Sequence, residues 1–443
     1  MKNILVIGAG RSASSMIKYL LDHSAKENWV VTVSDLSLEM VNRKTGNHPN
    51  ARAIVLDINN EQQRREEIAK SDIVISMLPA FMHYHVAVDC VASKKHLVTA
   101  SYVSKEIQEL DAQASKAGII FLNEMGLDPG IDHMSAMQII DQVKKDGGEI
   151  LSFKSYCGGL IAPESNDNPW GYKFTWNPRN VVLAGQGTAQ YKEKGIYRFI
   201  PYNRLFTQTE TITVDGYGDF DAYANRDSLS YQKPYGLENI PTILRGTLRM
   251  PGFCGAWNAF VKLGWTDDTY TIADSENITY SELLNAFLPA GNEPLKKRLA
   301  SFVGESENSE VIQKLVWLGI LENEKIKMKK ASPAVILQDL LERKWKLKEQ
   351  DVDMIVMQHQ FEYITKAEGR KGSIVSSLVV KGEDSVHTAM AKTVGLPVAI
   401  AVKLILQGKI GLKGVVIPTV AEIYSPVLKE LEMSGIIFKE KHT

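Results

Sequence analysis

Several features that mark large classes of proteins are scarce in this sequence. Only three of its 443 residues are cysteines, and they lie far apart: Cys90, Cys157 and Cys254. Their spacing matches no metal-binding motif, so we expect a reduced, cytoplasmic protein without a metal site. The 51 basic and 52 acidic side chains give a net charge of −1, so no overall field attracts nucleic acid or a membrane surface.

Long hydrophobic runs are also rare. The stretch 394–406, "VGLPVAIAVKLIL", is interrupted by Pro397 and Lys403, and we judge it too short to span a bilayer. The N-terminal apolar run is only about six residues long and leads into a glycine motif, which favours a buried strand over a signal peptide. With 44% hydrophobic and 23% charged residues, the composition is that of a soluble globular protein. A chain of this length should form two or three domains.

A glycine motif follows the first apolar run. In "KNILVIGAGRSASSMIKYL", residues 2–20, Gly8, Gly10 and Ala13 form a G-x-G-x-x-A pattern between a predicted strand and a predicted helix. The first glycine permits a sharp turn, and the second lets the backbone approach a pyrophosphate. The helix N-terminus then presents free N–H groups to the phosphates. The motif alone is a weak signal, because glycine-rich turns are common.

An acidic residue at the end of the next predicted strand strengthens this interpretation. "WVVTVSD", residues 29–35, ends in Asp35, whose carboxylate can accept hydrogen bonds from both hydroxyls of an adenosine ribose. A carboxylate there would repel a 2′-phosphate, and no arginine or lysine is adjacent to Asp35 in the sequence. We therefore expect NAD rather than NADP, with NADP still possible. In the alternative interpretation, Asp35 only caps a turn.

The strand-and-helix alternation continues through the first 125 residues. Further strands are predicted at 51–58, 71–79, 96–104 and 118–126, separated by helical stretches such as 61–70 and 82–94. This pattern predicts a Rossmann-type, doubly wound parallel sheet with its ligand at the carboxyl ends of the strands. Residues expected to contact the dinucleotide are Gly8, Gly10, Arg11, Ser12, Ala13, Asp35, Leu36, Asp57, Ile58, Leu78, Pro79, Thr99, Ala100 and Ser101.

The segment "MGLDPGIDHM", residues 125–134, follows the sixth predicted strand. Asp128 and Pro129 suggest the N-cap and first residue of a helix that Gly147 ends. A metal site is disfavoured, because a helix turns Asp132 and His133 about 100° apart. We expect Asp128 to face the crevice and bind a cationic substrate nitrogen, although a purely structural cap remains an alternative. His133 is better explained as a packing residue than as an acid or base.

Five segments together resemble the glutamate-forming saccharopine dehydrogenases: "VTASYVS", "NEMGLDPGIDHM", "SYCGGLIAPESNDNPWGYKFTWNPRNV", "YANRDS" and "ILRGTLRMPGF". They occur in the same order over most of the chain. The resemblance implies oxidation of saccharopine to glutamate and aminoadipate semialdehyde, and a homodimer. Family members with an acidic residue after the second strand prefer NAD, and those with arginine there prefer NADP, so Asp35 implies NAD. The chain departs from the family at Arg11, where an aromatic residue is more common.

The resemblance also implies a second, α+β substrate domain at about 126–394. It would contain a mixed sheet and a helical insertion at about 278–350, and residues 395–443 would complete the dinucleotide domain of residues 1–125. The sequence agrees, with strands predicted at 150–159, 209–218, 360–369 and 371–382. Leu-, Lys- and Glu-rich helices are predicted between residues 279 and 350, and a last long helix lies within 387–410.

The implied substrate carries three carboxylates, so its site should contain arginines that bind them in bidentate fashion. Arg226 lies in "YANRDS", and Arg245 and Arg249 lie in "ILRGTLR". Residues four apart share one side of either a helix or a strand. Any one arginine could still be an ordinary surface residue. The residues expected to bind substrate are Ser101, Tyr102, Asp128, Arg226, Arg245, Gly246, Thr247 and Arg249.

The candidate catalytic residues are Tyr102, Asp128 and Cys157, because each could carry a proton at the crevice. We expect Tyr102 and Asp128 to bind and orient, and Cys157 to line the pocket; an inert buried thiol explains Cys157 equally well. Two other functions stay open at this point. One is a carboxynorspermidine- or homospermidine-synthase-like amine dehydrogenase, and the other is a non-catalytic NAD sensor. The sequence gives neither the oligomeric state nor the physiological direction.

Overall fold

The computed structural model describes residues 1–365, 367 and 369–443. Two compact units emerge from the contacts between residues. Unit 1 comprises Met1–Ile150, Tyr363–Gly372 and Leu378–Thr443, and unit 2 comprises Leu151–Glu362 and Ser373–Ser377. The chain therefore passes more than once between the units, and each is described by itself below.

Unit 1 is built on a seven-stranded sheet. Its strands, in spatial order, are β17 (Gly414–Val416), β6 (Ile120–Leu122), β5 (His96–Thr99), β4 (Ile73–Ser76), β1 (Lys2–Ile7), β2 (Trp29–Asp35) and β3 (Ala51–Val55). All neighbouring strands are parallel. The predicted Rossmann-type sheet is confirmed, and the C-terminal segment supplies its seventh strand.

Helices connect these strands, as a parallel sheet requires. They are α1 (Ser14–Glu27), α2 (Leu38–Thr45), α3 (Glu61–Ala69), α4 (His83–Ser93), α5 (Lys105–Gln108) and α6 (Asp111–Ala117). Strands β1 and β4 are apolar on both faces because helices cover the sheet on both sides, and Ile4, Val6 and Ile73 are fully buried. Strand order reverses between β1 and β4, so the carboxyl ends of these two strands mark the usual ligand position of such folds.

Helix α7 (Ile131–Lys145) begins later than the sequence suggested. The prediction that Asp128 is its N-cap and Pro129 its first residue is wrong. The Asp128–Pro129 peptide bond is cis, and Gly130, with φ 147°, is the N-cap. Only glycine fits there, because a Cβ on Gly130 would lie 2.1 Å from the Gly126 carbonyl oxygen. Residues 126–130 therefore form a tight turn, in which the Gly126 amide donates to the Pro129 carbonyl, before the helix starts.

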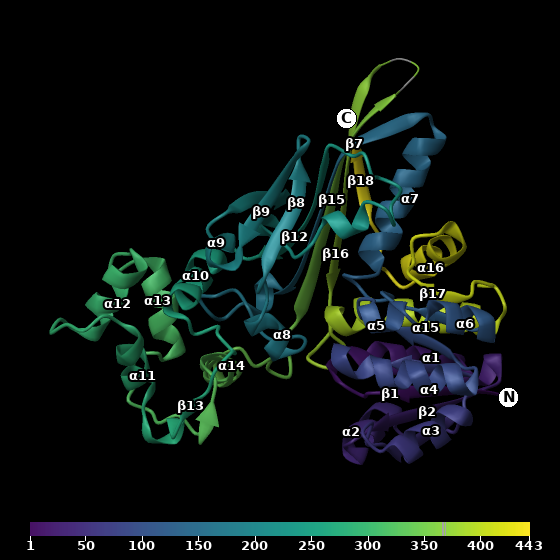
Figure 1. Cartoon of the computed structure of the whole chain (residues 1–443), viewed down its shortest axis with the longest axis horizontal. Helices are drawn as coiled ribbons and strands as arrows, with labels where there is room; N and C mark the ends of the chain where they lie inside the picture. The colour runs from purple at the N-terminus through teal and green to yellow at the C-terminus, as the bar shows by residue number, and fades with distance from the viewer. Residues whose placement is uncertain (366, 368) are drawn as a thin grey trace. The chain divides into compact units, whose positions relative to one another are not determined.

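Helix α7 belongs to unit 1, which thus extends beyond residue 125 to Ile150. It packs against α16 (Ala421–Met433), and the Tyr424 hydroxyl donates a 2.6 Å hydrogen bond to Asp141 on α7. The two helices lie side by side in Figure 1, although they are far apart in the sequence. Gly147, with φ 77°, follows the last turn of α7, where the sequence placed the end of the helix.

Helix α15 (Ala389–Leu406) is the one helix among the described residues that is long and apolar enough to cross a membrane. It is longer than the apolar run read from the sequence. However, 78% of it is buried inside the protein, where it packs against α1 and α16. Gly395 allows the close approach to α1, because a Cβ there would lie 3.0 Å from Met16. Its burial is that of a core helix.

The second sheet is built mainly from unit 2. Its main path runs β10 (Thr209–Val214), β11 (Gly218–Ala224), β12 (Thr242–Arg249), β7 (Gly148–Ile161), β15 (Asp353–Thr365), β16 (Lys371–Lys381) and β18 (Lys439–His442). A hairpin of β8 (Thr188–Glu193) and β9 (Ile196–Pro201) pairs with β12 through β8. The sheet is mixed, because β12 runs parallel to β7 but antiparallel to β11. The predicted mixed sheet is confirmed, whereas β8, β9, β11 and β12 were not predicted as strands.

The predicted strand at 360–369 corresponds to the end of β15 at Thr365. Two of its residues, Lys366 and Glu368, lie outside the described residues.

Unit 2 also contains the predicted group of helices. They are α11 (Tyr280–Phe287), α12 (Leu295–Val303), α13 (Glu310–Leu318) and α14 (Pro333–Lys344), drawn in green in Figure 1, preceded by α10 (Phe253–Leu263). Short helices α8 (Pro178–Val182) and α9 (Tyr202–Leu205) and the two-stranded β13 (Ile272–Ala273) and β14 (Lys330–Ala331) complete the unit. Aromatic rings in contact form its core beside α10: Trp170, Tyr172, Phe253, Trp257, Phe260 and Trp345.

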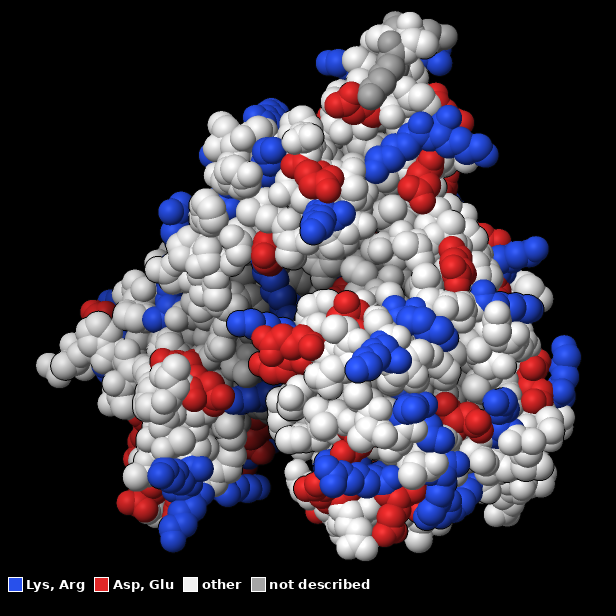
Figure 2. Space-filling model, turned by 45° about the vertical axis from the view of Figure 1, so that its right-hand side comes forward, with Lys and Arg blue, Asp and Glu red and all other residues white. Residues whose placement is uncertain are grey.

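Charged side chains of both signs are interspersed over the face of the molecule in Figure 2. This distribution agrees with the nearly balanced numbers of acidic and basic residues in the sequence.

Candidate active site

The glycine loop lies between β1 and α1 in unit 1. Gly8 has φ 103°, and a Cβ there would lie 2.9 Å from the Met77 carbonyl oxygen at the end of β4. A Cβ on Gly10 would instead meet nothing within 4 Å, so the backbone there faces open space. A short 3₁₀ turn, Arg11–Ala13, then leads into α1. The loop thus offers a phosphate group both space and the N-terminus of a helix.

Asp35 ends β2 and is anchored to this loop. One carboxylate oxygen accepts a 2.8 Å hydrogen bond from the Ala9 amide, and the other accepts a longer one, 3.4 Å, from the Ser37 amide. The carboxylate is therefore held beside the glycine loop, where the sequence places the ribose. The bond to Ser37 also fits the turn-capping alternative.

A lysine that the sequence analysis did not consider lies at the same loop. Lys44, in the last turn of α2, donates hydrogen bonds from Nζ to the Gly10 carbonyl at 2.8 Å and the Ser14 hydroxyl at 2.5 Å. Burial lowers the pKa of Lys44 to about 8, against the opposing effect of the Asp35 carboxylate. No cation is adjacent to Asp35 in the sequence, but α2 folds back and brings Lys44 to the same loop.

The other predicted cofactor residues gather where β2, β3, β4 and β5 end. Leu36 follows β2 and is 70% exposed, and Asp57 and Ile58 lie just after β3. Leu78 and Pro79 follow β4, while Thr99, Ala100 and Ser101 stand at the end of β5. Parallel strands end at one edge, so these residues share the edge that carries the glycine loop. Phe81, which was not predicted, is 76% exposed just after β4.

A buried histidine connects two of these strand ends. His83, the first residue of α4, lies between the hydroxyl of Ser76 at 2.7 Å and that of Ser101 at 2.8 Å. Burial lowers the pKa of His83 to about 4, so its imidazole is neutral near pH 7. One ring nitrogen then donates and the other accepts, which fixes both hydroxyls. From the sequence, His83 was predicted only as part of a helix.

Tyr102 and Asp128 are brought together, as two candidate catalytic residues should be. The Tyr102 hydroxyl donates a 3.0 Å hydrogen bond to Asp128. Backbone bonds hold the two segments in place, from the Glu124 amide to the Ser101 carbonyl and from the Met125 amide to the Thr99 carbonyl. Both side chains are only partly buried, so a ligand can reach them.

His133 is fully buried and faces a carboxylate. Its Nε2 lies 2.8 Å from Glu124, whose other oxygen accepts the Val103 amide at 3.1 Å. Glu124 itself has φ 58°, an unusual conformation for a residue other than glycine. This pair secures the backbone beside Tyr102, a role that the sequence analysis missed. Within the described part of the chain, no three His, Cys, Asp or Glu side chains form a group that could hold a metal ion.

The predicted arginines of unit 2 lie on and beside β12. Side chains alternate along a strand, so Arg245, Thr247 and Arg249 share one face. Cys157 on β7 pairs with Thr247, and its thiol is buried. Gly246 lies on the opposite face, where a Cβ would come within 2.6 Å of the Tyr156 ring. Gly246 thus lets a large ring pack against β12.

Arg249 is buried, with 4% of its surface exposed, and sits against aromatic rings. Its guanidinium carbon is 5.3 Å from the centre of the Tyr172 ring and 5.1 Å from that of Phe253. It donates a long hydrogen bond, 3.4 Å, to the Tyr223 hydroxyl, and its Nε has no partner among the described residues. The same residues place no carboxylate within 4.0 Å of this guanidinium.

Arg245 is also buried and stacks on Tyr231, with 4.2 Å between the guanidinium carbon and the ring centre. Arg226 lies near it in the loop after β11, where the Asn225 amide bonds to the Arg245 carbonyl at 2.8 Å. Arg226 has φ 46°, a left-handed conformation. The fold therefore brings Arg226 beside the β12 arginines in backbone position.

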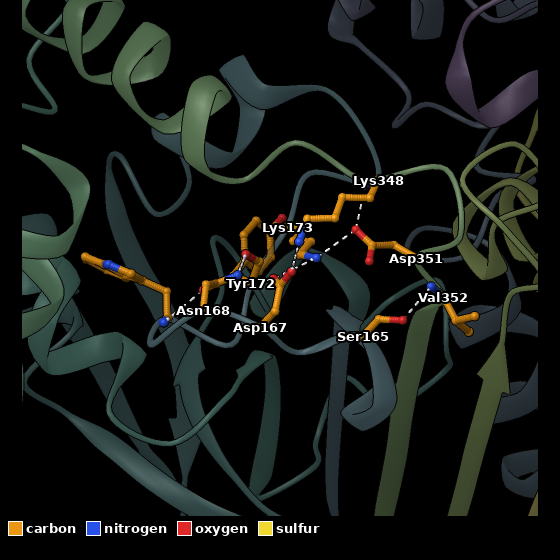
Figure 3. A network of polar contacts seen from close by, with 9 residues as sticks. Ser165, Asp167, Asn168, Tyr172, Lys173, Lys348, Asp351 and Val352 are labelled. Carbon is orange, nitrogen blue, oxygen red and sulfur yellow. Dashed lines mark hydrogen bonds and ion pairs between the residues drawn. The ribbon is translucent and has the colours of Figure 1, made fainter.

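A different buried cation, Lys173, is fully neutralised. Its Nζ lies 2.7 Å from Asp351 and 2.8 Å from Asp167, and Lys348 also pairs with Asp167 (Figure 3). The Lys348 amide donates to Asp351 at 2.6 Å, and the Val352 amide donates to the Ser165 hydroxyl at 2.9 Å. We call Asp167, Lys173, Lys348 and Asp351 the lysine network. It ties the loop before α8 to the segment before β15, and no pattern in the sequence indicated it.

Comparisons with known proteins match both parts of the chain. Residues 4–122 match the family described as the saccharopine dehydrogenase NADP binding domain, and residues 126–436 match the saccharopine dehydrogenase C-terminal domain. The saccharopine dehydrogenase [NADP(+), L-glutamate-forming] of Pyricularia oryzae is 36% identical over 99% of both chains. That of Schizosaccharomyces pombe is 35% identical over 100% of this chain and 99% of its own.

Longer proteins and a solved structure match as well. Bovine mitochondrial alpha-aminoadipic semialdehyde synthase is 34% identical over 100% of this chain, which corresponds to 48% of that protein. The apo saccharopine dehydrogenase (L-Glu forming) from Saccharomyces cerevisiae has a TM-score of 0.90, with 34% identity and full coverage of both chains. The fungal names carry NADP(+), so they do not support the expected preference for NAD.

Proposed function

Because the chain belongs to the saccharopine dehydrogenase family, we propose that it oxidises saccharopine with NAD(P)⁺ and water to glutamate and 2-aminoadipate 6-semialdehyde. The observation that carries this proposal is Arg249, a buried guanidinium without a carboxylate partner among the described residues. Removing a charge from water costs several kcal/mol unless a counter-charge compensates. A substrate carboxylate is the missing counter-charge.

Two neighbouring arginines add positive charge near Arg249, as a substrate with several carboxylates requires. Arg245 shares the strand face of Arg249, and Arg226 lies one residue beyond Asn225, which bonds to the Arg245 backbone. The flat faces of Tyr172, Phe253 and Tyr231 support the guanidinium planes of the two strand arginines. Ring contacts use the face of a guanidinium, so the edge N–H groups of Arg249 can still form bidentate bonds to a carboxylate.

The dinucleotide site is assigned to the loop and strand ends of unit 1. Gly10 offers open backbone space there, and Asp35 is anchored beside it. The bound dinucleotide would accept the hydride from the substrate carbon next to the bridging nitrogen. Loss of that hydride requires a neutral amine, so the nitrogen must first lose its proton. We assign Tyr102 and Asp128, joined by their 3.0 Å hydrogen bond, to binding and orienting that nitrogen.

Proton transfer in this scheme needs few protein groups. Water attacks the iminium carbon, and collapse of the carbinolamine breaks the carbon–nitrogen bond and releases glutamate. Asp128 is the acceptor suited to the amine proton, while Tyr102 holds its carboxylate in position. Cys157 is assigned to the pocket wall, because its thiol is buried beside Thr247. His83 is neutral and fixes Ser101 rather than acting as an acid.

We propose a preference for NAD on the basis of Asp35, although the fungal relatives carry NADP(+) in their names. The carboxylate supports this by accepting from the loop amide of Ala9 and so lying where ribose hydroxyls bind. Changing Asp35→Arg should raise kcat/KM with NADP relative to NAD by about tenfold, since one charged contact contributes about 1.4 kcal/mol. An unchanged ratio would contradict the ribose contact.

The central test follows absorbance of the reduced cofactor with saccharopine plus NAD, and then plus NADP. A rise with either supports the enzyme assignment, and the relative rates test the NAD preference. No rise with either would refute it. A rise with a polyamine-type substrate instead would support the rival amine dehydrogenase. Dinucleotide binding without any turnover would support a sensor.

Homodimerisation is a further proposal that rests on family analogy. A cytoplasmic location is another, and it rests on the few, widely spaced cysteines. Sedimentation equilibrium at several protein concentrations would test the first, because a monomer mass of 49.3 kDa throughout would refute it. The physiological direction is testable by comparing the equilibrium position with measured levels of the reactants.

A further inference from the structure

Lys44 lies at the edge of the glycine loop, and its ammonium forms no ion pair with the described residues. Its Nζ uses two donors on neutral acceptors, the Gly10 carbonyl and the Ser14 hydroxyl. The described residues place no carboxylate within 4.0 Å of it, although the Asp35 charge is close enough to raise its pKa. An ammonium has three N–H donors, so one remains for a ligand. Its side chain is only partly buried, which leaves it accessible.

The position of Lys44 connects it to the adenosine end of a dinucleotide. Asp35 holds the loop at the Ala9 amide, and Lys44 holds it one residue later at the Gly10 carbonyl. The two side chains thus bear opposite charges at adjacent loop residues. Asp35 suits the hydroxyls of an unmodified ribose, whereas an ammonium suits a phosphate. Ser14, which Lys44 also contacts, begins α1, whose N-terminus favours anions.

We infer that Lys44 binds the 2′-phosphate of NADP, and that Asp35 and Lys44 together let one site accept both dinucleotides. This inference rests on the proposed dinucleotide role of unit 1. It accounts for an acidic residue of NAD-type enzymes in a chain whose relatives carry NADP(+) in their names. Lys44 acts as a specificity-determining residue, and it takes no part in hydride transfer.

Binding measurements without saccharopine provide the test. Adenosine 2′,5′-bisphosphate and 5′-AMP differ only by the 2′-phosphate, and titration calorimetry gives the Kd of each for the full chain. We expect Lys44→Met to raise the Kd of the bisphosphate about tenfold, the equivalent of one charge-assisted hydrogen bond. The Kd of 5′-AMP should change less than about threefold, and Lys44→Arg should retain most of the preference.

Arg43→Met is the matched control. Arg43 is the preceding residue on α2, is exposed and pairs with Glu39, so its loss should alter neither Kd. Circular dichroism checks that each variant folds; if Lys44→Met does not, Lys44→Gln replaces it. Equal weakening of both nucleotides by the Lys44 variants would overturn the inference, because Lys44 would then only hold the loop. Failure of the unaltered protein to bind NAD, NADP or either nucleotide would instead refute the proposed function.

Discussion

Lys173 and Arg249 are both buried in unit 2, yet their surroundings differ in charge. Lys173 lies between two carboxylates, those of Asp351 and Asp167, in the lysine network of Figure 3. Arg249 lies over Tyr172 and Phe253 and has no carboxylate among the described residues within ion-pair distance. Tyr172 and Lys173 are adjacent in the sequence. Two adjacent residues therefore belong to different environments: Lys173 is a neutralised cation, whereas the Tyr172 ring contacts Arg249, which has no carboxylate partner among the described residues.

This difference separates a structural charge from a ligand-binding charge. A buried cation with carboxylates at 2.7–2.8 Å is satisfied without any ligand. A buried cation with one long bond to a neutral hydroxyl has capacity for an anion. Burial and residue type alone would have assigned the same role to both. The comparison predicts that Arg249 variants lose substrate binding, whereas Lys173 variants lose stability.

The largest expected effect is that of Arg249→Met on substrate binding. The KM for saccharopine should rise about 100-fold or more, because a bidentate charged contact contributes about 3 kcal/mol. The Kd for the dinucleotide should stay within about twofold. The free energy of unfolding should not fall, since the hydrogen bond that is lost is a long one to a neutral hydroxyl and no carboxylate among the described residues loses its counter-charge. Steady-state kinetics, titration of the dinucleotide and urea unfolding measure the three quantities.

Arg249→Lys serves as its companion, because it keeps the charge but loses bidentate geometry. Its KM should lie between those of the unaltered protein and Arg249→Met. Equal increases in the KM for saccharopine and the Kd for the dinucleotide would argue against a carboxylate-binding role. A large loss of stability in Arg249→Met would show that Arg249, like Lys173, is a structural charge.

The second prediction concerns stability. Lys173→Met should lower the free energy of unfolding by about 3–5 kcal/mol, because it leaves the Asp351 carboxylate buried without its cation. The Asp351 side chain is only 9% exposed in the ion pair. Urea unfolding measures the change. Any folded fraction should keep a KM for saccharopine within a few-fold of normal, since Tyr172 still supports Arg249 through its ring.

Lys348→Met is the matched control for Lys173→Met. Lys348 pairs with the same Asp167, but its side chain is 72% exposed. Exposed ion pairs contribute about 0–1 kcal/mol, so the control should change stability by no more than that. If Lys173→Met lowered the free energy of unfolding by no more than the small change expected for Lys348→Met, the lysine network would have no structural role.

The sequence predicted those features that depend on local pattern. The apolar strands were recognisable because a parallel strand covered on both faces has a distinctive composition. The glycine loop and Asp35 lie at the carboxyl ends of these strands, as predicted. The shared face of Arg245 and Arg249 followed from a spacing valid for either helix or strand. These inferences needed no knowledge of tertiary contacts.

Features formed by distant residues were missed. Lys44 reaches the glycine loop only because α2 folds back along the sheet, and Lys173 meets Asp351 across 178 residues of sequence. Pro129 suggested a helix start, but the turn around Gly130 delays the helix. Whether a buried arginine has a carboxylate partner is likewise a tertiary property. The structure was therefore needed to distinguish Arg249 from Lys173.

The smallest expected effect is a pH dependence confined to the lysine network. Hydrogen bonds from Lys173, and then from Lys348, lower the pKa of Asp167 from its usual 3.8 to about 2. A carboxyl whose pKa is lower in the folded than in the unfolded state stabilises the fold above pH 4. That contribution is lost as pH falls from about 4 towards 2. Because the Asp167 side chain is 42% exposed, solvent screening keeps the effect small.

Asp167→Asn isolates this contribution. Urea unfolding between pH 5 and pH 2.5 should show a shallower fall in stability for Asp167→Asn than for the unaltered protein. Arg249→Met should show the unaltered slope, because the described residues give Arg249 no carboxylate whose proton binding could change with folding. Parallel slopes in all three proteins would mean that solvent screens the Asp167 pairs completely. If Arg249→Met changed how steeply stability falls with pH, Arg249 would have an acidic partner. It would then be a paired cation like Lys173.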